Sequence, residues 1–250
     1  HILVTNDDGV QAPGLLALAG AMRQLGAVTV IAPHQNQSAI GHRKTMHKPL
    51  RAWQASLADG TAAIATSGSP ADAVALALLG LVEEPVNMVV SGINHGPNLS
   101  RDITYSGTVT AAMEGVIWNL PALAVSLDSY GEADYTCAAD SALRVARLVA
   151  EHGLSPLTLL NINVPGRPAE QIAGMRITRQ GRRVYRDELV QRLDPRGQPY
   201  YWIGGKAPTG DYEEEGTDVW AVAHGYISVT PISMDMTNHN AIGALQEWEW

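Results

Sequence analysis

The sequence predicts an α/β fold in which helices cover both faces of a mostly parallel β-sheet. Over the first two thirds of the 250 residues, short apolar runs alternate with helical patterns. The run at residues 86–90 is almost wholly apolar, which is typical of a strand buried on both faces. Residues 175–230 instead hold short strand-like runs separated by Gly, Pro and charged residues, which indicates antiparallel hairpins.

The elements of the first part follow from local signals. The predicted strands are the apolar runs at 2–5, 28–32, 62–66, 86–90, 122–127 and 157–164. Helical patterns lie between them at 13–25, 70–79, 108–118 and 135–152. Pro13 and Gly14 open the first helix, and Ser69 with Asp72 forms a capping box before the second. Residues 33–45 form a long polar loop, and such loops in compact domains are usually functional or disordered.

The pattern changes after Pro165. Strand-like runs occur at 175–178, 200–203, 219–223 and 226–230. We interpret them as hairpins that either extend the core or form an oligomerisation arm. Residues 241–250 are expected to form a short helical tail, which leaves three large side chains exposed unless something covers them, namely Ile242, Leu245 and Trp248.

Composition and charge restrict the class of protein. Apolar residues make up 46% and charged residues 17%, as in ordinary globular proteins. No apolar stretch approaches the roughly 20 residues that span a bilayer, and no export signal is visible, so we expect a cytoplasmic protein without a membrane partner. The single cysteine, Cys137, fits a reducing compartment. Seventeen basic and 25 acidic residues give a net charge of −8 without a long basic stripe, which argues against a nucleic-acid binder.

The run Asn6–Gly9 follows the first predicted strand and contains two adjacent carboxylates, Asp7 and Asp8. Two such groups at the end of a buried strand repel each other and are costly to desolvate, and a cation between them removes that cost. Open α/β sheets also bind their ligands just beyond the carboxyl ends of strands. Taken alone, however, the run fits an ordinary turn or helix cap better.

A second segment, residues 89–98, strengthens the interpretation as a metal site. It again places an apolar run before a polar loop, and it offers amide oxygens at Asn94 and Asn98. Candidate ligands that are hard oxygen donors suit Mg²⁺, Mn²⁺ or Ca²⁺, and they are Asp7, Asp8, Ser38 and Asn94. A zinc site is set aside because no standard ligand spacing occurs among the histidines of this region, His34, His42 and His47.

The turn formed by Ser106, Gly107 and Thr108 leads into a predicted helix. Free N–H groups and hydroxyls at a helix N-terminus can hold a phosphate, although Ser106 also fits a simple N-cap. A metal site in the same crevice favours the phosphate interpretation. Motifs for binding dinucleotides or nucleoside triphosphates are absent, as is a serine-hydrolase elbow. The chemistry that these residues indicate is metal-assisted hydrolysis of a phosphate ester.

Nine segments, in this order, resemble the SurE family, the survival-protein-E nucleotidases. They are residues 2–9, 37–38, 68–72, 91–98, 105–109, 161–165, 194–197, 216–218 and 225–231. The resemblance runs through nearly the whole chain. It implies a metal-dependent phosphatase acting on nucleoside 5′- and 3′-monophosphates, and in some members on short polyphosphate.

The resemblance also implies a cofactor and roles for individual residues. One divalent cation per subunit, Mg²⁺ or Mn²⁺, is expected. Catalytic roles fall on Asp7 and Asp8. The implied metal ligands are Asp7, Asp8, Ser38 and Asn94. The implied phosphate-binding groups are Asn6, Asn98, Ser106, Gly107 and Thr108.

By the same resemblance, residues 1–250 form one domain that assembles into a homodimer or homotetramer. Residues 1–165 are expected to form a Rossmann-like, three-layer core that carries the active site. Residues 166–250 are expected to supply a β-hairpin extension and an oligomerisation tail, in which Asp235 and His239 are either subunit contacts or surface residues. Two other interpretations stay open: a nucleotide-binding sensor without catalysis, and a scaffold protein in which Asn6–Gly9 is only a turn.

Overall fold

The computed structural model describes residues 1–205, 208–210 and 212–249. Its centre is a nine-stranded sheet. The order of the strands across it is β3 (Ala52–Ser56), β4 (Ala62–Thr66), β2 (Val28–Pro33), β1 (Ile2–Thr5), β5 (Met88–His95), β6 (Ala122–Asp128), β7 (Thr158–Pro165), β13 (Tyr226–Ser233) and β8 (Gly174–Ile177). The six strands from β4 to β7 run parallel. The predicted mostly parallel sheet is therefore confirmed.

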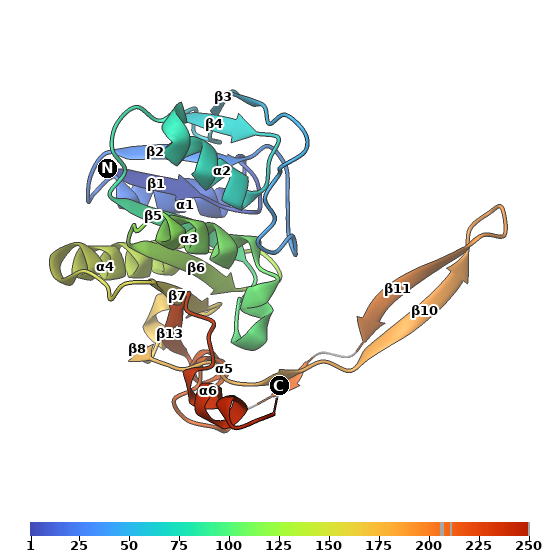
Figure 1. Cartoon of the computed structure of the whole chain (residues 1–250). Coiled ribbons are helices and arrows are strands. Elements are labelled where there is room, and N and C mark those ends of the chain that lie inside the picture. Colours follow the sequence, from blue (N-terminus) through green and yellow to red (C-terminus); the bar gives the residue numbers. More distant parts are fainter. Residues whose placement is uncertain (206–207, 211, 250) are drawn as a thin grey trace.

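Helices cover both faces of this sheet and complete three layers (Figure 1). On one face lie α1 (Pro13–Met22) and α4 (Thr136–His152), and on the other lie α2 (Pro70–Leu76) and α3 (Gly107–Ile117). Each pair buries its own apolar cluster, with Leu18 and Leu143 in one and Val74 and Val109 in the other. Such burial stabilises the fold by roughly 25 cal/mol per Å² of apolar surface.

The direction in which successive strands are added to the sheet reverses at β1, and this reversal positions the candidate site. From β1 the chain passes to β2 on one side, whereas β5 lies on the other side of β1. The carboxyl end of β1 is therefore a topological switch point, where open α/β sheets form their ligand-binding crevices. The residues that follow this strand are Asn6, Asp7 and Asp8.

After Pro165 the chain contributes both to the sheet and to a projecting arm. The strands β8 and β13 join the sheet, so this part of the chain extends the core, which is one of the two interpretations of its strand-like runs. Antiparallel strands β10 (Asp187–Leu193) and β11 (Pro199–Gly205) form the arm, which reaches away from the body (Figure 1). A short pair, β9 (Arg183–Val184) and β12 (Thr209–Gly210), connects the arm to the body.

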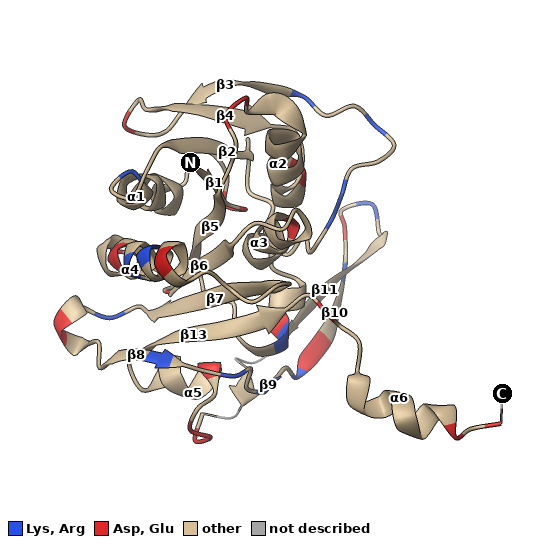
Figure 2. Ribbon diagram, turned by 60° about the vertical axis from the view of Figure 1, so that its left-hand side comes forward, with Lys and Arg blue, Asp and Glu red and all other residues tan. Residues whose placement is uncertain are grey.

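The remaining elements are short. They are η1 (Ala77–Leu81), which continues α2 as a π turn, η2 (Ser100–Thr104), η3 (Ala169–Gln171), α5 (Asp218–Ala223) and the tail helix α6 (His239–Gln246). The tail helix was expected and stands apart from the sheet in Figure 2, while Trp250 lies outside the described residues. Within residues 1–205, 208–210 and 212–249, no helix has both the length and the apolar character needed to cross a bilayer.

The structure corrects one predicted element and adds strands that the sequence pattern did not predict. Residues 219–223 are helical, not a strand, because Thr217 caps them: its hydroxyl accepts a hydrogen bond from the Trp220 N–H at 3.1 Å. Short apolar runs fit a buried helix as well as a strand, and here the cap decides. Strands β3 and β10 lack the apolar runs that mark the others and were not predicted.

Candidate active site

Asp7 lies beneath the N-terminus of α3. It is 3% exposed, and the Thr108 hydroxyl donates a hydrogen bond to its Oδ1 at 2.5 Å. Gly107 permits this approach, since a Cβ atom there would lie 2.7 Å from the Cβ of Asp7. The structure therefore brings Asp7, which is followed directly by Asp8, against the Ser106–Thr108 turn. These segments are about 100 residues apart in the sequence.

The carboxylates of this crevice are electrostatically strained. Burial raises the pKa of Asp7 to about 6, Thr108 counteracts this through its hydrogen bond, and the neighbouring Asp8 adds to the rise. Burial also raises the pKa of Asp8, although the His95 backbone N–H donates to its Oδ2 at 3.1 Å and favours the charged form. Among the described residues, no Lys or Arg forms an ion pair with either carboxylate.

The predicted long loop passes over the end of β1. The Gln37 N–H donates to the Asp7 carbonyl at 2.7 Å. Asn36 connects the loop to the crevice, because its Nδ2 donates to Asp8 Oδ1 at 3.2 Å while its Oδ1 accepts from the Ser38 N–H at 2.8 Å. The exposed Ser38 is thereby held next to the carboxylates. We did not predict a role for Asn36, although an amide two residues before Ser38 was a visible signal.

Asn94 lies near the end of β5, directly beside β1. The pairing of β5 with β6 shifts between Ser91 and Asn94, and such irregularities re-aim side chains near active sites. The Nδ2 of Asn94 donates to the Gly96 carbonyl at 2.8 Å. Because the amide nitrogen is fixed in this way, its Oδ1 is presented on the opposite side as an acceptor.

Two residues of the predicted phosphate-binding set have their side chains turned into the protein. Asn6 is fully buried and exchanges two hydrogen bonds with Gly9, at 3.0 and 3.2 Å. Asn98 is buried as well, and its amide donates to the Ser126 hydroxyl at 2.8 Å. Both asparagines therefore fix the shapes of the loops that border the crevice.

The Ser106–Thr108 turn offers backbone rather than hydroxyl donors. The Ser106 hydroxyl accepts from the Val109 N–H at 3.1 Å, so Ser106 acts as the N-cap, and its carbonyl accepts from Thr110. The Thr108 hydroxyl is engaged with Asp7. The N–H groups of Gly107 and Thr108, the first two of α3, are those that Ser106 does not take, and helix N-termini favour anions there.

Glu114, another buried acid on α3, anchors the long loop. Its side chain accepts from Lys44 Nζ at 2.7 Å, His42 Nε2 at 3.1 Å and Trp118 Nε1 at 3.3 Å. Burial raises the pKa of Glu114, but the hydrogen bonds from His42 and Lys44 outweigh it and bring the pKa to about 2. The sequence contains a signal for this buried acid, since Glu114 stands between Met113 and Gly115 in an otherwise apolar helical pattern, but we did not predict its role.

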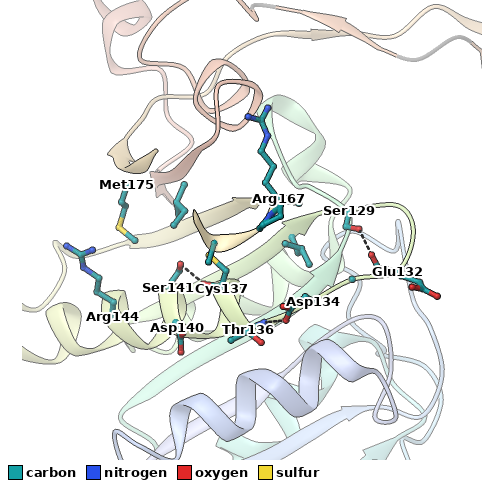
Figure 3. Close-up of a pocket in the computed structure, with 16 residues that line it drawn as sticks. Ser129, Glu132, Asp134, Thr136, Cys137, Asp140, Ser141, Arg144, Arg167 and Met175 are labelled. Carbon is teal, nitrogen blue, oxygen red and sulfur yellow. Dashed lines mark hydrogen bonds between the residues drawn. The ribbon is translucent and has the colours of Figure 1, made fainter. Parts of the chain in front are cut away.

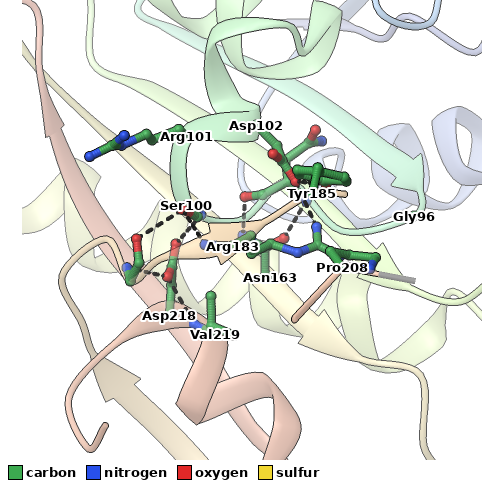
Figure 4. A network of polar contacts seen from close by, with 12 residues as sticks. Gly96, Ser100, Arg101, Asp102, Asn163, Arg183, Tyr185, Pro208, Asp218 and Val219 are labelled. Atoms are coloured by element: carbon green, nitrogen blue, oxygen red, sulfur yellow. Dashed lines mark hydrogen bonds and ion pairs between the residues drawn. The ribbon is translucent and has the colours of Figure 1, made fainter. Parts of the chain in front are cut away.

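A polar network joins the candidate site to the base of the arm (Figure 4). In η2, just before the Ser106 turn, the Ser100 N–H donates to Asp218 Oδ2 at 2.7 Å. Asp102 of the same turn accepts from Arg183 Nη1 at 2.7 Å and from the Tyr185 hydroxyl at 2.5 Å. Since Arg183 begins β9, the segment leading into α3 is fixed to the base of the arm.

A hollow of about 580 Å³ between α4 and residues 166–175 contains none of the predicted site residues (Figure 3). Cys137, Arg144 and Arg167 are among the residues that line it. Its lining has no pair of adjacent carboxylates. The chemistry indicated by the sequence therefore belongs to the crevice at the end of β1.

The crevice has the donor types that a hard divalent cation requires. The two carboxylates follow β1, the loop that carries Ser38 is bonded to Asp8 through Asn36, and the strand that carries Asn94, β5, lies beside β1. In the described part of the chain, no group of three or more His, Cys, Asp or Glu side chains forms a metal cluster. The fit therefore rests on oxygen donors, and the raised pKa values of Asp7 and Asp8 show that a positive charge would stabilise them.

Comparisons with known proteins agree with this geometry. The family model described as "Survival protein SurE" matches residues 2–187. The chain belongs to the SurE family. A SurE relative from Chloroflexus aggregans, named 5′-nucleotidase SurE, is 51% identical over 100% of this chain and 99% of its own length. A relative of the same name from Geobacter sulfurreducens is 48% identical over 100% of this chain and 94% of its own.

A solved structure supports the same assignment at the level of the fold. The SurE protein from Aquifex aeolicus superimposes with a TM-score of 0.84 at 39% sequence identity, covering 98% of each chain. The similarity of the fold thus extends through the part of the chain after Pro165.

Proposed function

We infer that this SurE-family chain is a 5′-nucleotidase that hydrolyses nucleoside monophosphates with the help of a divalent cation. The observation that carries the proposal is the pair Asp7 and Asp8, which lies under a helix N-terminus without a cationic side chain from the described residues. The two relatives named 5′-nucleotidase, which align along nearly their whole lengths, support it.

In the proposed mechanism, Asp7 and Asp8 would hold the cation and orient the attacking water, while Ser38 and Asn94 would complete the ligand set. A bound divalent cation supplies Lewis acidity and lowers the pKa of water. The water oxygen forms a bond to phosphorus, and the bond between phosphorus and the ester oxygen of the nucleoside breaks. The leaving oxygen takes one proton of the attacking water and the other proton stays with the phosphate, so the products are nucleoside and hydrogen phosphate.

The remaining predicted residues act on the phosphate or on the loops around it. We propose that the N–H groups of Gly107 and Thr108 take up the charge that develops on the phosphoryl oxygens. Ser106 keeps those groups available by capping α3. Asn6 and Asn98 support the phosphate site indirectly, by fixing its neighbouring loops.

The finer features of the proposal concern metal, substrate range and location. We propose Mg²⁺ or Mn²⁺ as the cation and include nucleoside 3′-monophosphates and short polyphosphate as further substrates. A reducing cytoplasm suits a chain with a single cysteine. Residues 1–250 are proposed to form one domain, because β8 and β13 complete the sheet of the first part.

The test is phosphate release from a panel of nucleoside 5′- and 3′-monophosphates with Mg²⁺, Mn²⁺ or a chelator. We expect release that requires the metal and that is faster with nucleotides than with an aryl phosphate. A folded protein that releases no phosphate with either metal would contradict the proposal and favour the nucleotide sensor.

We further propose that the arm formed by β10 and β11 mediates a homodimer or homotetramer. An isolated two-stranded hairpin is at best marginally stable in water, and this one exposes Leu189, Trp202 and Ile203 by 63–79%. Light scattering should show an oligomer, and Trp202→Asp with Ile203→Asp should reduce it to a monomer. A wild-type monomer at micromolar concentration would refute this part.

A further inference from the structure

A groove of about 440 Å³ opens beside Asp8, at the edge of the proposed metal site. It spans the end of β1, because its walls come from the ends of β2 and β5, the strands on either side. The floor is formed by residues 9–13, which lead from β1 into α1. The side chains that matter for its chemistry are Gln11, His34, Asn36, His95 and Tyr135.

One wall of the groove consists of two aromatic rings. The centroids of His95 and Tyr135 lie 6.4 Å apart at an angle of 57°, and His95 Nδ1 is 3.0 Å from the tyrosine oxygen. The hydrogen bond fixes the exposed His95 ring against its neighbour. His34, at the opposite wall, packs on Trp53 at 5.6 Å. Rings held in this way offer faces on which a planar heterocycle stacks.

The two carboxylates differ in accessibility. Asp7 is covered by α3, since Gly107 lies against its side chain and Asp7 is 3% exposed. Asp8 is more accessible and borders the groove. A phosphate placed between the metal ligands and the N-terminus of α3 therefore has its ester-linked group directed past Asp8.

We propose that this groove binds the nucleoside of the substrate, with the base stacked on His95 and Tyr135. The inference rests on the proposed function. It deepens that function by naming residues that discriminate between nucleotides and other phosphate esters. The volume lies within the range of small-molecule sites, roughly 300–1,000 Å³. Gln11 and Asn36 supply polar groups at the rim, as recognition of a base or ribose requires.

The experiment compares two substrates that share the same phosphate ester but differ in the base, namely adenosine 5′-monophosphate and ribose 5-phosphate. For the wild type, we expect a higher kcat/KM with the nucleotide. His95→Ala and Tyr135→Ala should each reduce that preference about fivefold or more, mainly through the KM of the nucleotide, because base–aromatic stacking has this magnitude. Tyr135→Phe keeps the ring and should retain most of the preference.

A matched control and the opposite outcomes make the test decisive. His152→Ala removes an exposed histidine at the far end of α4 and should leave both kcat/KM values as in the wild type. An unchanged substrate preference in both His95→Ala and Tyr135→Ala would overturn the groove proposal while phosphate release itself continues. Absence of release from both substrates in the wild type would instead overturn the proposed function.

Discussion

Two buried carboxylates lie at α3, Asp7 beneath its N-terminus and Glu114 in its second half, and their surroundings shift their pKa values in opposite directions. Glu114 accepts hydrogen bonds from Lys44 and His42, and its pKa falls to about 2. Asp7 lies as deeply buried, yet its nearest charged neighbour is another carboxylate, Asp8, and its pKa rises to about 6. The helix α3 thus carries one neutralised acid, Glu114, and covers another, Asp7, that has no cationic partner among the described residues.

This difference distinguishes an acid that anchors a loop from acids that are arranged to bind a ligand. An acid whose cation is part of the chain fixes a loop permanently, as Glu114 does for the loop that carries Ser38. An acid without one stores an unfavourable free energy that a bound cation relieves, so the site is arranged for a ligand. The comparison therefore gives Glu114 a structural role and supports the proposed metal-binding role of Asp7 and Asp8. Three substitutions test it.

The largest expected effect is loss of activity in Asp7→Asn and in Asp8→Asn. Each change removes a charge that holds the cation, and metal stabilisation of the transition state is worth several kcal/mol. We expect kcat to fall at least about 10³-fold, equivalent to about 4 kcal/mol, in phosphate release from nucleoside monophosphates. Activity near that of the wild type in either variant would remove the distinction between the two sets of acids.

The second effect is on stability and has the opposite sign to most core substitutions. Raising the pKa of Asp7 from 3.8 to about 6 costs about 3 kcal/mol at pH 7 in the metal-free protein. The native state binds the proton more tightly, so the stability that Asp7 contributes is complete below pH 3.8 and is lost as the pH rises through 6. Asp7→Asn should therefore stabilise the metal-free protein at pH 7 by up to about 3 kcal/mol.

Urea unfolding with a chelator, at pH 7 and at pH 4, measures this gain. It should be present at pH 7 and nearly absent at pH 4. Asp140→Asn, which changes an exposed carboxylate on α4, is the matched control and should have little effect at either pH. If Asp7→Asn were less stable than the wild type at pH 7, burial of the charged Asp7 carboxylate would not be costing the metal-free protein stability.

Part of this arrangement could be predicted from the sequence. The alternation of apolar runs with helical patterns predicted the parallel sheet, and the parallel strands then placed the ends of β1 and β5 side by side. That placement alone brings Asp8 near Asn94. Periodicity did not distinguish a strand from a helix at 219–223, where the N-cap by Thr217 decides. In the arm, the run at 200–203 predicted β11, but β10 has no buried face and was not predicted.

The side-chain partners within the site were beyond prediction. A sequence run such as Asn6–Gly9 does not show that the Asn6 amide closes on Gly9 whereas Asp7 faces α3. Nor does it show which of the polar residues in a 13-residue loop, such as Asn36 or Lys44, reaches a buried acid. These choices depend on contacts between segments about 30 to 100 residues apart, which only tertiary packing determines.

The smallest expected effect comes from removing the lysine that neutralises Glu114, which would leave this buried carboxylate without its strongest positive partner. Lys44→Met removes the cation 2.7 Å from Glu114 and preserves the length of the side chain. A buried acceptor that loses its donor costs about 1–3 kcal/mol, and His42 and Trp118 still donate, so we expect a destabilisation within that range by urea unfolding at pH 7. Because the same loop carries Ser38 and Asn36, the KM for nucleotides should rise as well.

Lys48→Met is the matched control for this change, since Lys48 is an exposed lysine just outside the loop. It removes the same charge without touching Glu114 and should leave both stability and KM close to those of the wild type. Equal effects from the two lysine substitutions would show that net charge, rather than the Lys44–Glu114 pair, holds the loop. A destabilisation specific to Lys44→Met would show that the positive charge of Lys44 is what makes the buried Glu114 stabilise the fold, the partner that Asp7 lacks among the described residues.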